Sequence, residues 1–310
     1  MTGRRITAAE LATAQVTEIL ALVRAATQAD GVAPLSEHVM LRLRYDTPGL
    51  AGAGRSGAGR DFVVSAGAEI AGYACLDPPP ADPEVTGELV IHPGHRRLGL
   101  GRALADALIA AAGGRVLRIW AHGDLPAAAA LARAAGFERF RALWQMRRSL
   151  RQPLARLTLP AGRTLRTFVP GRDEDEWLGL NGRAFAKHPE QGGWTRHDLE
   201  LREREPWFDP AGFFIADRDG RMAGFHWTKA HDPSLGEVYV VGVDPAEQGS
   251  GLGRALTLAG LHHLQGCGMA LAMLYVDEDN VPAIRMYEGL GFTRARVDAM
   301  YRRPPGASPP

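Results

Sequence analysis

One block of sequence occurs twice in this chain. Residues 96–104 read RRLGLGRAL and residues 248–256 read QGSGLGRAL, an offset of 152 residues (248 − 96 = 152). Pro93 and Pro245 share this offset. A second match, Ala-Gly-Phe ending at Phe137 and Leu-Gly-Phe ending at Phe292, follows at an offset of 155 (292 − 137 = 155). Two matched blocks in the same order predict that a whole domain is duplicated.

The length of the chain agrees with two domains. A chain of 310 residues exceeds what one hydrophobic core usually supports, which favours two domains of about 150 residues. Residues 149–163 contain Pro153, Pro160 and Gly162 and are typical of a linker. We therefore predict a first copy at 1–148 and a second at 164–303. The Gly/Ala/Arg-rich segment 49–59 is expected to be mobile, and the Pro-rich tail 304–310 to be disordered.

Composition excludes several classes of partner. Lys plus Arg (36) nearly equals Asp plus Glu (35), so no overall field favours nucleic acid or an anionic membrane. The two cysteines, one in each half, give no disulfide scaffold, as expected in a reduced compartment. Polar residues from Glu10 to Glu18 interrupt what would be an apolar signal segment. We expect a cytoplasmic protein without a membrane span, and a monomer, since each copy already has an internal partner.

Both halves show the same order of expected elements, which predicts an α/β (α+β) fold. Asp219-Gly220 is a strong hairpin turn, because both positions tolerate positive φ. In the first copy we expect a helix at 7–26, a hairpin at 62–65 and 70–75, a strand at 88–91, a helix at 99–112, a strand at 116–121, a helix at 126–134 and a strand from 137. In the second we expect strands at 213–216, 222–227 and 237–243, a helix at 251–264 and a strand at 270–276.

The repeated block has the features of a phosphate-binding loop. A β-branched strand ending at Val243 leads through a turn into a Gly-rich segment that opens a helix. Glycines allow several backbone N–H groups to face one concavity, and the helix N-terminus adds partial positive charge. A dinucleotide fingerprint would need a third glycine where Leu256 stands, and the lysine of a Walker loop is missing. Binding of NAD or ATP in those modes is therefore disfavoured.

At these residues the chain resembles the GNAT N-acetyltransferase superfamily, whose signature is a strand followed by Gln/Arg-x-x-Gly-x-Gly/Ala at the start of a helix. The resemblance implies two tandem domains, each a mixed, mostly antiparallel sheet flanked by helices. It also implies acetyl-CoA as co-substrate, no metal, and loop N–H groups that bind the CoA pyrophosphate. The residues that it assigns to the coenzyme in the first copy are Leu89, Val90, Ile91, Arg96, Arg97, Leu98, Gly99, Leu100 and Gly101. Those in the second copy are Val241, Gly242, Val243, Gln248, Gly249, Ser250, Gly251, Leu252, Gly253 and Arg254.

A second motif, at residues 280–292, is similar to the family's Asn-x-x-Ala-x-x-x-Tyr-x-x-x-Gly-Phe. Asn280 or the preceding Asp279 can cap a helix, and Gly291 can end it in a left-handed conformation. The resemblance places this helix along the CoA arm. The first copy has Leu125 at the site of the Asn and Ala132 at the site of the Tyr (287 − 155 = 132), which predicts a degenerate, non-catalytic copy. The coenzyme contacts implied here are Asn280, Val281, Pro282, Ala283, Ile284 and Arg285.

Amide formation from a thioester needs a neutral amine and a protonated leaving thiol. Glu237 begins the strand that leads to the loop and is the candidate base, acting directly or through water. Tyr287 is the candidate acid, because a phenol with a pKa near 10 can donate to a thiolate. A backbone N–H near Val241 or Val243 would polarise the acetyl carbonyl. Without the family context, a Glu at a strand start is more often solvated and a helix Tyr more often packs in a core.

Three further segments resemble one tandem-copy branch of the superfamily, which acetylates the cysteinyl amine of a cysteine–glucosamine–inositol pseudodisaccharide. They are residues 184–194 (AFAKHPEQGGW), 225–229 (FHWTK) and 237–245 (EVYVVGVDP). The substrate contacts that this resemblance implies are Glu37, Glu190, Lys229, Glu237 and Tyr275. Carboxylates can bind an ammonium group or sugar hydroxyls, and a lysine can donate to polyol oxygens.

Two other functions remain open from the sequence. The chain could acetylate another small amine, such as an antibiotic or a polyamine, although a polyamine site would favour an acidic pocket without Lys229. Alternatively, both copies could sense an acyl-CoA without turnover. Ala132 fits that alternative in the first copy, whereas Glu237 together with Tyr287 argues against it in the second.

Overall fold

The computed structural model describes residues 5–45, 60–77, 83–188 and 191–306. The segment 49–59, residues 307–310 of the tail and the candidate contact Glu190 lie outside the described residues. The chain divides into two compact units, an N-terminal unit (Met1–Leu143 with Val297–Pro310) and a C-terminal unit (Trp144–Arg296).

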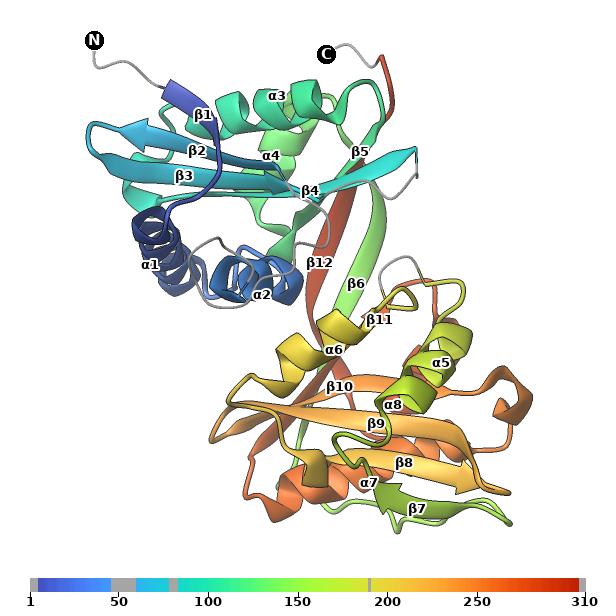
Figure 1. The fold of residues 1–310 in the computed structure, drawn as a ribbon. Helices are drawn as coiled ribbons and strands as arrows, with labels where there is room; N and C mark the ends of the chain where they lie inside the picture. The colour runs from blue at the N-terminus through green and yellow to red at the C-terminus, as the bar shows by residue number, and fades with distance from the viewer. Residues whose placement is uncertain (1–4, 46–59, 78–82, 189–190, 307–310) are drawn as a thin grey trace. The chain divides into compact units, whose positions relative to one another are not determined.

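The N-terminal unit is a mixed sheet with helices on both faces (Figure 1). Its strands are β1 (Arg5–Ala9), β2 (Arg60–Ala66), β3 (Glu69–Leu76), β4 (Glu84–Ile91) and β5 (Val116–Ala121), antiparallel except for β4 and β5. Helices α1 (Thr13–Asp30) and α2 (Glu37–Tyr45) bury one apolar core against the sheet. Helices α3 (Leu100–Ala112) and α4 (Pro126–Ala134) bury a second core on the opposite face.

The C-terminal unit repeats this plan. Its strands are β7 (Thr164–Thr167), β8 (Phe213–Arg218), β9 (Arg221–Asp232), β10 (Leu235–Val243) and β11 (Leu271–Asp277), antiparallel except for β10 and β11. Helices α5 (Glu174–Ala184) and α6 (Arg196–Glu203) cover a largely aromatic core around Trp177, Phe213 and Trp227. Helices α7 (Leu252–Gly266) and α8 (Val281–Glu288) cover the other face (Figure 1).

The two copies exchange their last strands. Strand β6 (Glu138–Ser149) enters the C-terminal unit, where it lies next to β11 in the strand order. Strand β12 (Thr293–Arg303) ends in the N-terminal unit, where Ala299–Arg303 pair antiparallel with β5. The compact units therefore differ from the predicted copies at their edges. The copy boundaries at 148 and 164 stay a prediction. The compact units show which residues pack together, and strand exchange makes them differ from the copies that are repeated in the sequence.

The predicted fold class is confirmed, and so are most of the predicted elements. The expected helix 126–134 and strand 116–121 match α4 and β5 to the residue. The helix expected at 7–26 is wrong at its start, because residues 5–9 pair with β2 as strand β1 and helix α1 begins only at Thr13. A partner more than fifty residues away decides this local conformation, which a helical pattern could not reveal.

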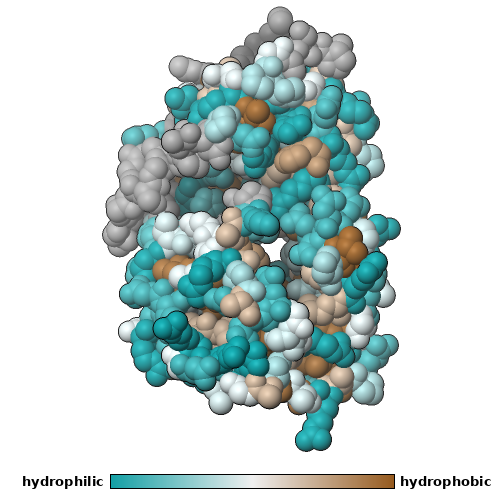
Figure 2. Space-filling view, turned by 90° about the vertical axis from the view of Figure 1, so that its right-hand side faces the viewer, coloured by the Kyte–Doolittle hydropathy of each residue, from teal (hydrophilic) through white to brown (hydrophobic). Residues whose placement is uncertain are grey.

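Among the described residues, no helix combines the length and the apolar character that a span would need. The face in Figure 2 is mainly hydrophilic, with apolar residues scattered rather than gathered into one patch. Single apolar residues are normal on a protein surface. Within the same described residues, no group of three His, Cys, Asp or Glu side chains is arranged to hold a metal ion.

Candidate active site

The central strands of the C-terminal unit diverge at Glu237. Strands β10 and β11 pair in parallel over three residue pairs, which end at Glu237–Met273. Beyond this point β10 continues to Val243 and keeps its pairing with β9. Backbone groups of a strand require hydrogen-bond partners. The edge of β10 that faces β11 can therefore accept another extended chain, such as the pantetheine arm of a coenzyme. In the N-terminal unit, β4 and β5 diverge in the same way after Gly87–Ile119.

Two β-bulges frame this divergence. The β9–β10 register places Leu235 opposite Asp232 but Gly236 opposite Ala230, so His231 is an extra residue on β9. On the other side of Glu237, Tyr239 is an extra residue on β10, between the pairs of Val238 and Val240. Bulges redirect side chains and occur often beside active sites. Here Tyr239 and Val240 both join the aromatic core under α5 and α6, whereas Val238 packs on the opposite face.

Glu237 is a buried carboxylate with two basic neighbours. Its side chain is 8% exposed, and its Oε2 lies 2.6 Å from Nε2 of His231, whose side chain is 31% exposed. Lys229 is its direct cross-strand partner in the register. A buried carboxylate needs such partners, because an isolated buried charge is strongly unfavourable. The arrangement holds a carboxyl group at the point where the two strands diverge.

Lys229 lies over two aromatic rings on the same face. Its Nζ is 4.6 Å from the centre of the Trp207 ring and 5.0 Å from that of Tyr239. Trp207 also packs against Trp227, and the Tyr239 hydroxyl accepts a hydrogen bond of 2.8 Å from Nε of Arg202 on α6. Cation–π contacts fix an ammonium group without neutralising it. The face around Glu237 thus combines acidic, basic and aromatic groups.

The Gly-rich loop after β10 has the backbone expected of an anion site. Gly249 (φ 77°) and Gly251 (φ 87°) both adopt the left-handed conformation, and Gly251 is the N-cap of α7 with no side chain to cap it. Residues 248–251 are exposed. The N–H groups of a helix's first turn have no partners within the helix. Here the Leu252 N–H donates to the Ser250 hydroxyl at 3.4 Å, and the N–H groups that follow it can face an anionic ligand. Apart from the adjacent residues, no atom of the described residues lies within 4 Å of where a side chain on Gly249 or Gly251 would begin, which leaves room for a diphosphate.

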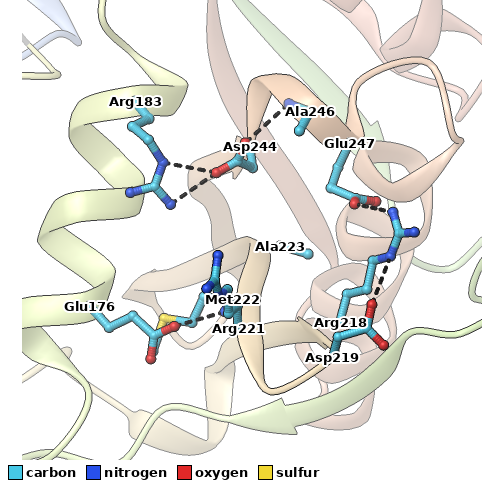
Figure 3. Close-up of a pocket in the computed structure, with 10 residues that line it drawn as sticks. All are labelled: Glu176, Arg183, Arg218, Asp219, Arg221, Met222, Ala223, Asp244, Ala246 and Glu247. Carbon is cyan, nitrogen blue, oxygen red and sulfur yellow. Dashed lines mark hydrogen bonds and ion pairs between the residues drawn. The ribbon is translucent and has the colours of Figure 1, made fainter.

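Ion pairs hold the turn that precedes this loop (Figure 3). Arg183 from α5 lies 2.9 Å from Asp244, and Arg218 donates a 2.7 Å hydrogen bond to Glu247. Arg163 donates to the other oxygen of Glu247 at 3.1 Å, and the two arginines lower the pKa of this carboxyl. A recess of about 890 Å³ lies between these groups and is lined by acidic and basic side chains. These side chains form the ion pairs that hold the turn, so we assign the recess to the support of the loop.

The N-terminal unit keeps the same loop geometry with different residues. Arg97 (φ 63°) and Gly99 (φ 80°) stand in the left-handed region at the positions of Gly249 and Gly251. A non-glycine residue there costs about 1 kcal/mol or more. Arg96 forms a bidentate pair with Asp30 at 2.7 and 2.8 Å. The left-handed conformation is therefore kept in this copy despite its cost. Arg96, one of the predicted coenzyme contacts, is already bound to Asp30.

Tyr287 is a buried phenol on α8. It is 9% exposed and stacks edge-on against Phe292 in the core under α7 and α8, which also contains Val238 and Val241. Burial raises the pKa of Tyr287 to about 12. At physiological pH its hydroxyl is therefore fully protonated, as a proton donor must be. Ala132, at the corresponding position of α4, packs against the core of the N-terminal unit.

The other predicted contacts have diverse settings. The Tyr275 side chain is exposed, and its hydroxyl accepts a hydrogen bond of 2.9 Å from Gln145. Glu37 is the first residue of α2 in the N-terminal unit. Gly242 packs so closely on the Phe225 ring that a side chain there would overlap it. Asn280 caps α8 by accepting from the Ala283 N–H at 3.3 Å, and Val281 is 47% exposed at the start of that helix.

Sequence reasoning missed His231 and Tyr239. Their roles depend on bulges, which the alternation of residues along a strand does not reveal. It also missed Glu88, which is buried on β4 just past the last β4–β5 pair and accepts a hydrogen bond of 2.6 Å from the Ser36 N–H. Burial raises the pKa of Glu88. Its bond to Ser36 ties the start of α2 to the sheet.

A family model supplies the class of this protein. The model of the acetyltransferase (GNAT) family matches residues 30–137 and 181–292, one range for each copy. Together the two ranges cover more than half of the chain. The chain belongs to this family, and it is an N-acetyltransferase enzyme with two GNAT regions. The resemblance noted in its sequence is confirmed.

Curated relatives give a narrower comparison. The mycothiol acetyltransferase of Thermomonospora curvata is 59% identical over 292 residues, 94% of each chain. That of Thermobispora bispora is 58% identical over 92% of this chain and 95% of the relative. Among solved structures, a tandem GNAT protein from the clavulanic acid biosynthesis pathway has a TM-score of 0.74 and 24% identity, covering 99% of this chain and 100% of that one. A GCN5-related N-acetyltransferase from Sphaerobacter thermophilus has a TM-score of 0.68. These structures share the fold.

Proposed function

We propose that the C-terminal unit transfers the acetyl group of acetyl-CoA to the cysteinyl amine of desacetylmycothiol, the cysteine–glucosamine–inositol pseudodisaccharide, and so forms mycothiol. The relatives named mycothiol acetyltransferase, with identities of 59% and 58%, support this acceptor. The observation that carries the proposal is the buried Glu237 carboxylate, flanked by two bulges where β10 and β11 diverge.

The residues present fit acetyl-CoA. The two left-handed glycines at 249 and 251 and the uncapped start of α7 suit its diphosphate, and residues 241–243 suit its pantetheine arm. When bound, the coenzyme supplies an activated thioester. In this proposal a backbone N–H of Val241 or Val243 donates to the acetyl oxygen as negative charge develops on it. Asn280 to Arg285 would also contact the coenzyme in this proposal.

Glu237 removes a proton from the ammonium group of the acceptor, directly or through one water molecule, and so makes the amine neutral. Tyr287 donates its hydroxyl proton to the departing thiolate. An ammonium acceptor and a thioester become an amide, a thiol and one free proton, so one of the two protons that leave nitrogen ends on sulfur and the other reaches solvent. Positioned acid and base groups of this kind each contribute about 10²- to 10⁴-fold to a rate.

The acceptor site in this proposal consists of Lys229, Glu237 and Tyr275 of the C-terminal unit, while Glu37 and Glu190 stay predictions from the sequence resemblance. Lys229 donates to sugar or inositol hydroxyls, and Trp207 and Tyr239 hold its ammonium group in place. The N-terminal unit is non-catalytic in this proposal, because Ala132 offers no proton donor where the second copy has Tyr287. The enzyme acts as a monomer in the cytoplasm, a compartment in which Cys75 and Cys267 stay reduced.

The test is a direct assay of acetyl-CoA consumption with desacetylmycothiol, beside a polyamine and an aminoglycoside as competing acceptors. We expect the pseudodisaccharide to have the highest kcat/KM. Lys229→Gln should raise the KM for desacetylmycothiol about 10-fold, the loss of one charged hydrogen bond, without changing the KM for acetyl-CoA. Preference for a polyamine would replace the proposed acceptor. Tight coenzyme binding without turnover of any amine would support an acyl-CoA sensor instead.

A further inference from the structure

We propose that His231 is a positioning residue that holds Glu237 and carries the proton from it to solvent. This inference rests on the proposed role of Glu237 as the base. The starting observation is the shortest contact of the Glu237 carboxylate among the described residues, 2.6 Å from its Oε2 to Nε2 of His231. Nothing in the family signature involves this histidine.

The backbone presents His231 to Glu237 through the bulge on β9. In a regular antiparallel pair, the residue after Ala230 would continue the ladder opposite Leu235. Instead Asp232 takes that place, and His231 is extra. A bulge of this kind turns a side chain out of the normal alternation. The histidine therefore reaches the carboxylate of a residue that is not its ladder partner.

Burial makes such a carrier necessary. The Glu237 side chain is 8% exposed, whereas that of His231 is 31% exposed. A base that receives a proton in every turnover must release it before the next one. One nitrogen of the imidazole faces Glu237, and a ring can accept a proton at one nitrogen and release one from the other. His231 thus joins the buried carboxylate to water.

The surrounding charges suit this path. Asp232, next to His231, is exposed, and its carboxylate accepts hydrogen bonds from the Ser234 hydroxyl and from the N–H groups of Ser234 and Leu235. Lys229, two residues away on the same strand, has its ammonium group over Trp207 and Tyr239. A carboxylate beside the imidazole stabilises the transient imidazolium, while the lysine charge is held on the rings.

The proton balance of this path is simple. The amine gives one proton to the Glu237 carboxylate, which becomes a carboxylic acid. That proton passes to Nε2 of His231, and the imidazolium releases the proton of its other nitrogen to water. Glu237 returns to a carboxylate, exchange of the ring protons with water restores the starting tautomer of His231, and one proton leaves for each acetyl group transferred. The proton that reaches the thiolate comes from Tyr287, and the second proton lost by the amine nitrogen as the amide forms restores the Tyr287 hydroxyl.

The experiment uses the full-length enzyme with acetyl-CoA and desacetylmycothiol at saturation. We expect His231→Ala to lower kcat about 10- to 100-fold, the range of a lost proton-transfer aid, with the KM for acetyl-CoA within about twofold. Added imidazole should restore kcat in a saturable manner. His231→Gln keeps a hydrogen-bond donor for Glu237 but cannot carry a proton, so it should lose kcat and gain nothing from imidazole.

His262→Ala is the matched control. This histidine lies on α7 in the same unit, where its Nε2 is 3.0 Å from the Ala155 carbonyl oxygen. We expect its kcat to equal the wild-type value with and without imidazole. If the wild-type enzyme is active, either of two results would overturn the role of His231. One is a wild-type kcat in His231→Ala, and the other is a loss of kcat that added imidazole does not restore. Absence of turnover by the wild type would refute the proposed function itself, and with it the base that His231 serves.

Discussion

At the scale of single residues, burial decides what the candidate groups can do. The buried Glu237 carboxylate lies 2.6 Å from His231, and Lys229 is its cross-strand partner. Burial raises the pKa of Tyr287 to about 12. The proposed acid and the proposed base therefore differ in environment as much as in chemistry.

Tyr287→Phe tests the acid. The substitution removes one hydroxyl from a ring that stays packed on Phe292, so the fold and coenzyme binding should be unchanged. We expect kcat to fall about 100-fold, as for loss of a general acid, with the KM for acetyl-CoA within about twofold. Because the pKa of Tyr287 is raised to about 12, the wild-type phenol should stay protonated across the pH range of an ordinary assay. A variant with wild-type kcat would exclude Tyr287 as the donor.

His226 should make stability depend on pH. This histidine of β9 is fully buried, its Nδ1 lies 2.8 Å from the Leu256 carbonyl oxygen, and burial lowers its pKa from 6.5 to about 4. Between about pH 6.5 and pH 4, His226 therefore binds a proton in the unfolded chain but not in the folded chain. The free energy of unfolding should fall as pH drops from about 6.5 towards 4, by about 2 kcal/mol at pH 5.

His226→Asn provides the comparison, because the amide nitrogen can replace Nδ1 as donor to Leu256. Denaturant unfolding, followed by tryptophan fluorescence, measures the free energy of unfolding at pH 7.5 and at pH 5. The decrease between these two pH values should be about 2 kcal/mol smaller in the variant than in the wild type. Equal losses in both proteins would mean that His226 does not carry this dependence.

At the scale of elements, the two Gly-rich loops share a backbone and differ in side chains. The left-handed pair is Arg97 and Gly99 in one copy and Gly249 and Gly251 in the other. In each case a short 3₁₀ turn precedes the loop, η1 (Pro93–His95) or η4 (Pro245–Glu247). The residues before these turns, His92 and Asp244, each accept a hydrogen bond from the N–H two residues on. The duplicated local sequence thus builds the same turn twice.

Gly251→Val and Gly99→Val form a matched pair. Both replace a left-handed glycine, φ 87° and 80°, with a β-branched residue and should cost similar stability. Gly251→Val should raise the KM for acetyl-CoA at least about 10-fold, because the loop can no longer present its N–H groups. Gly99→Val should leave kcat and this KM unchanged, and calorimetry would count the coenzyme sites that remain. Equal effects of both changes on turnover would show that the first copy takes part in catalysis.

At the scale of the whole molecule, the strand exchange links the stability of the N-terminal unit to the end of the chain. Ala299, Met300 and Tyr301 are buried there, and Asp298 accepts hydrogen bonds from the Gly123 N–H (2.8 Å) and from Nδ1 of His122 (3.0 Å). Burial of a side chain such as Met300 is worth about 1.5–3 kcal/mol. The last strand is thus part of a core whose other members precede residue 144.

Removal of residues 297–310 should destabilise the N-terminal unit by several kcal/mol, because the burial of about three side chains is lost. It should also leave β5 as an open edge. Hydrogen exchange of the β5 amides should become fast, and the protein should aggregate on heating. Removal of residues 304–310 alone is the control and should change neither measurement. Slow exchange of β5 in the longer truncation would contradict the importance of the exchanged strand.

The sequence predicted well those features that depend on neighbouring residues. The Gly-rich loops, the cap at Asn280 and helix α4 all follow from residues within a few positions of one another. Helices α2, α5 and α6 were not predicted, since each is short and only part of each faces a core. Of the candidate site, Glu237, Lys229 and Tyr287 lie in one unit with the loop, but the groups that surround Glu237 were not foreseen.

What the sequence by itself determined is the duplication, the family and the local geometry of the loops, because glycines, caps and motifs act over a few residues. Only the tertiary structure decided that residues 5–9 form a strand, that His231 and Tyr239 are bulged around Glu237, and that β12 pairs with β5. These three features depend on which distant strand supplies the hydrogen-bond partners and in which register. That choice is made by the packing of the whole sheet, and no stretch of neighbouring residues contains it.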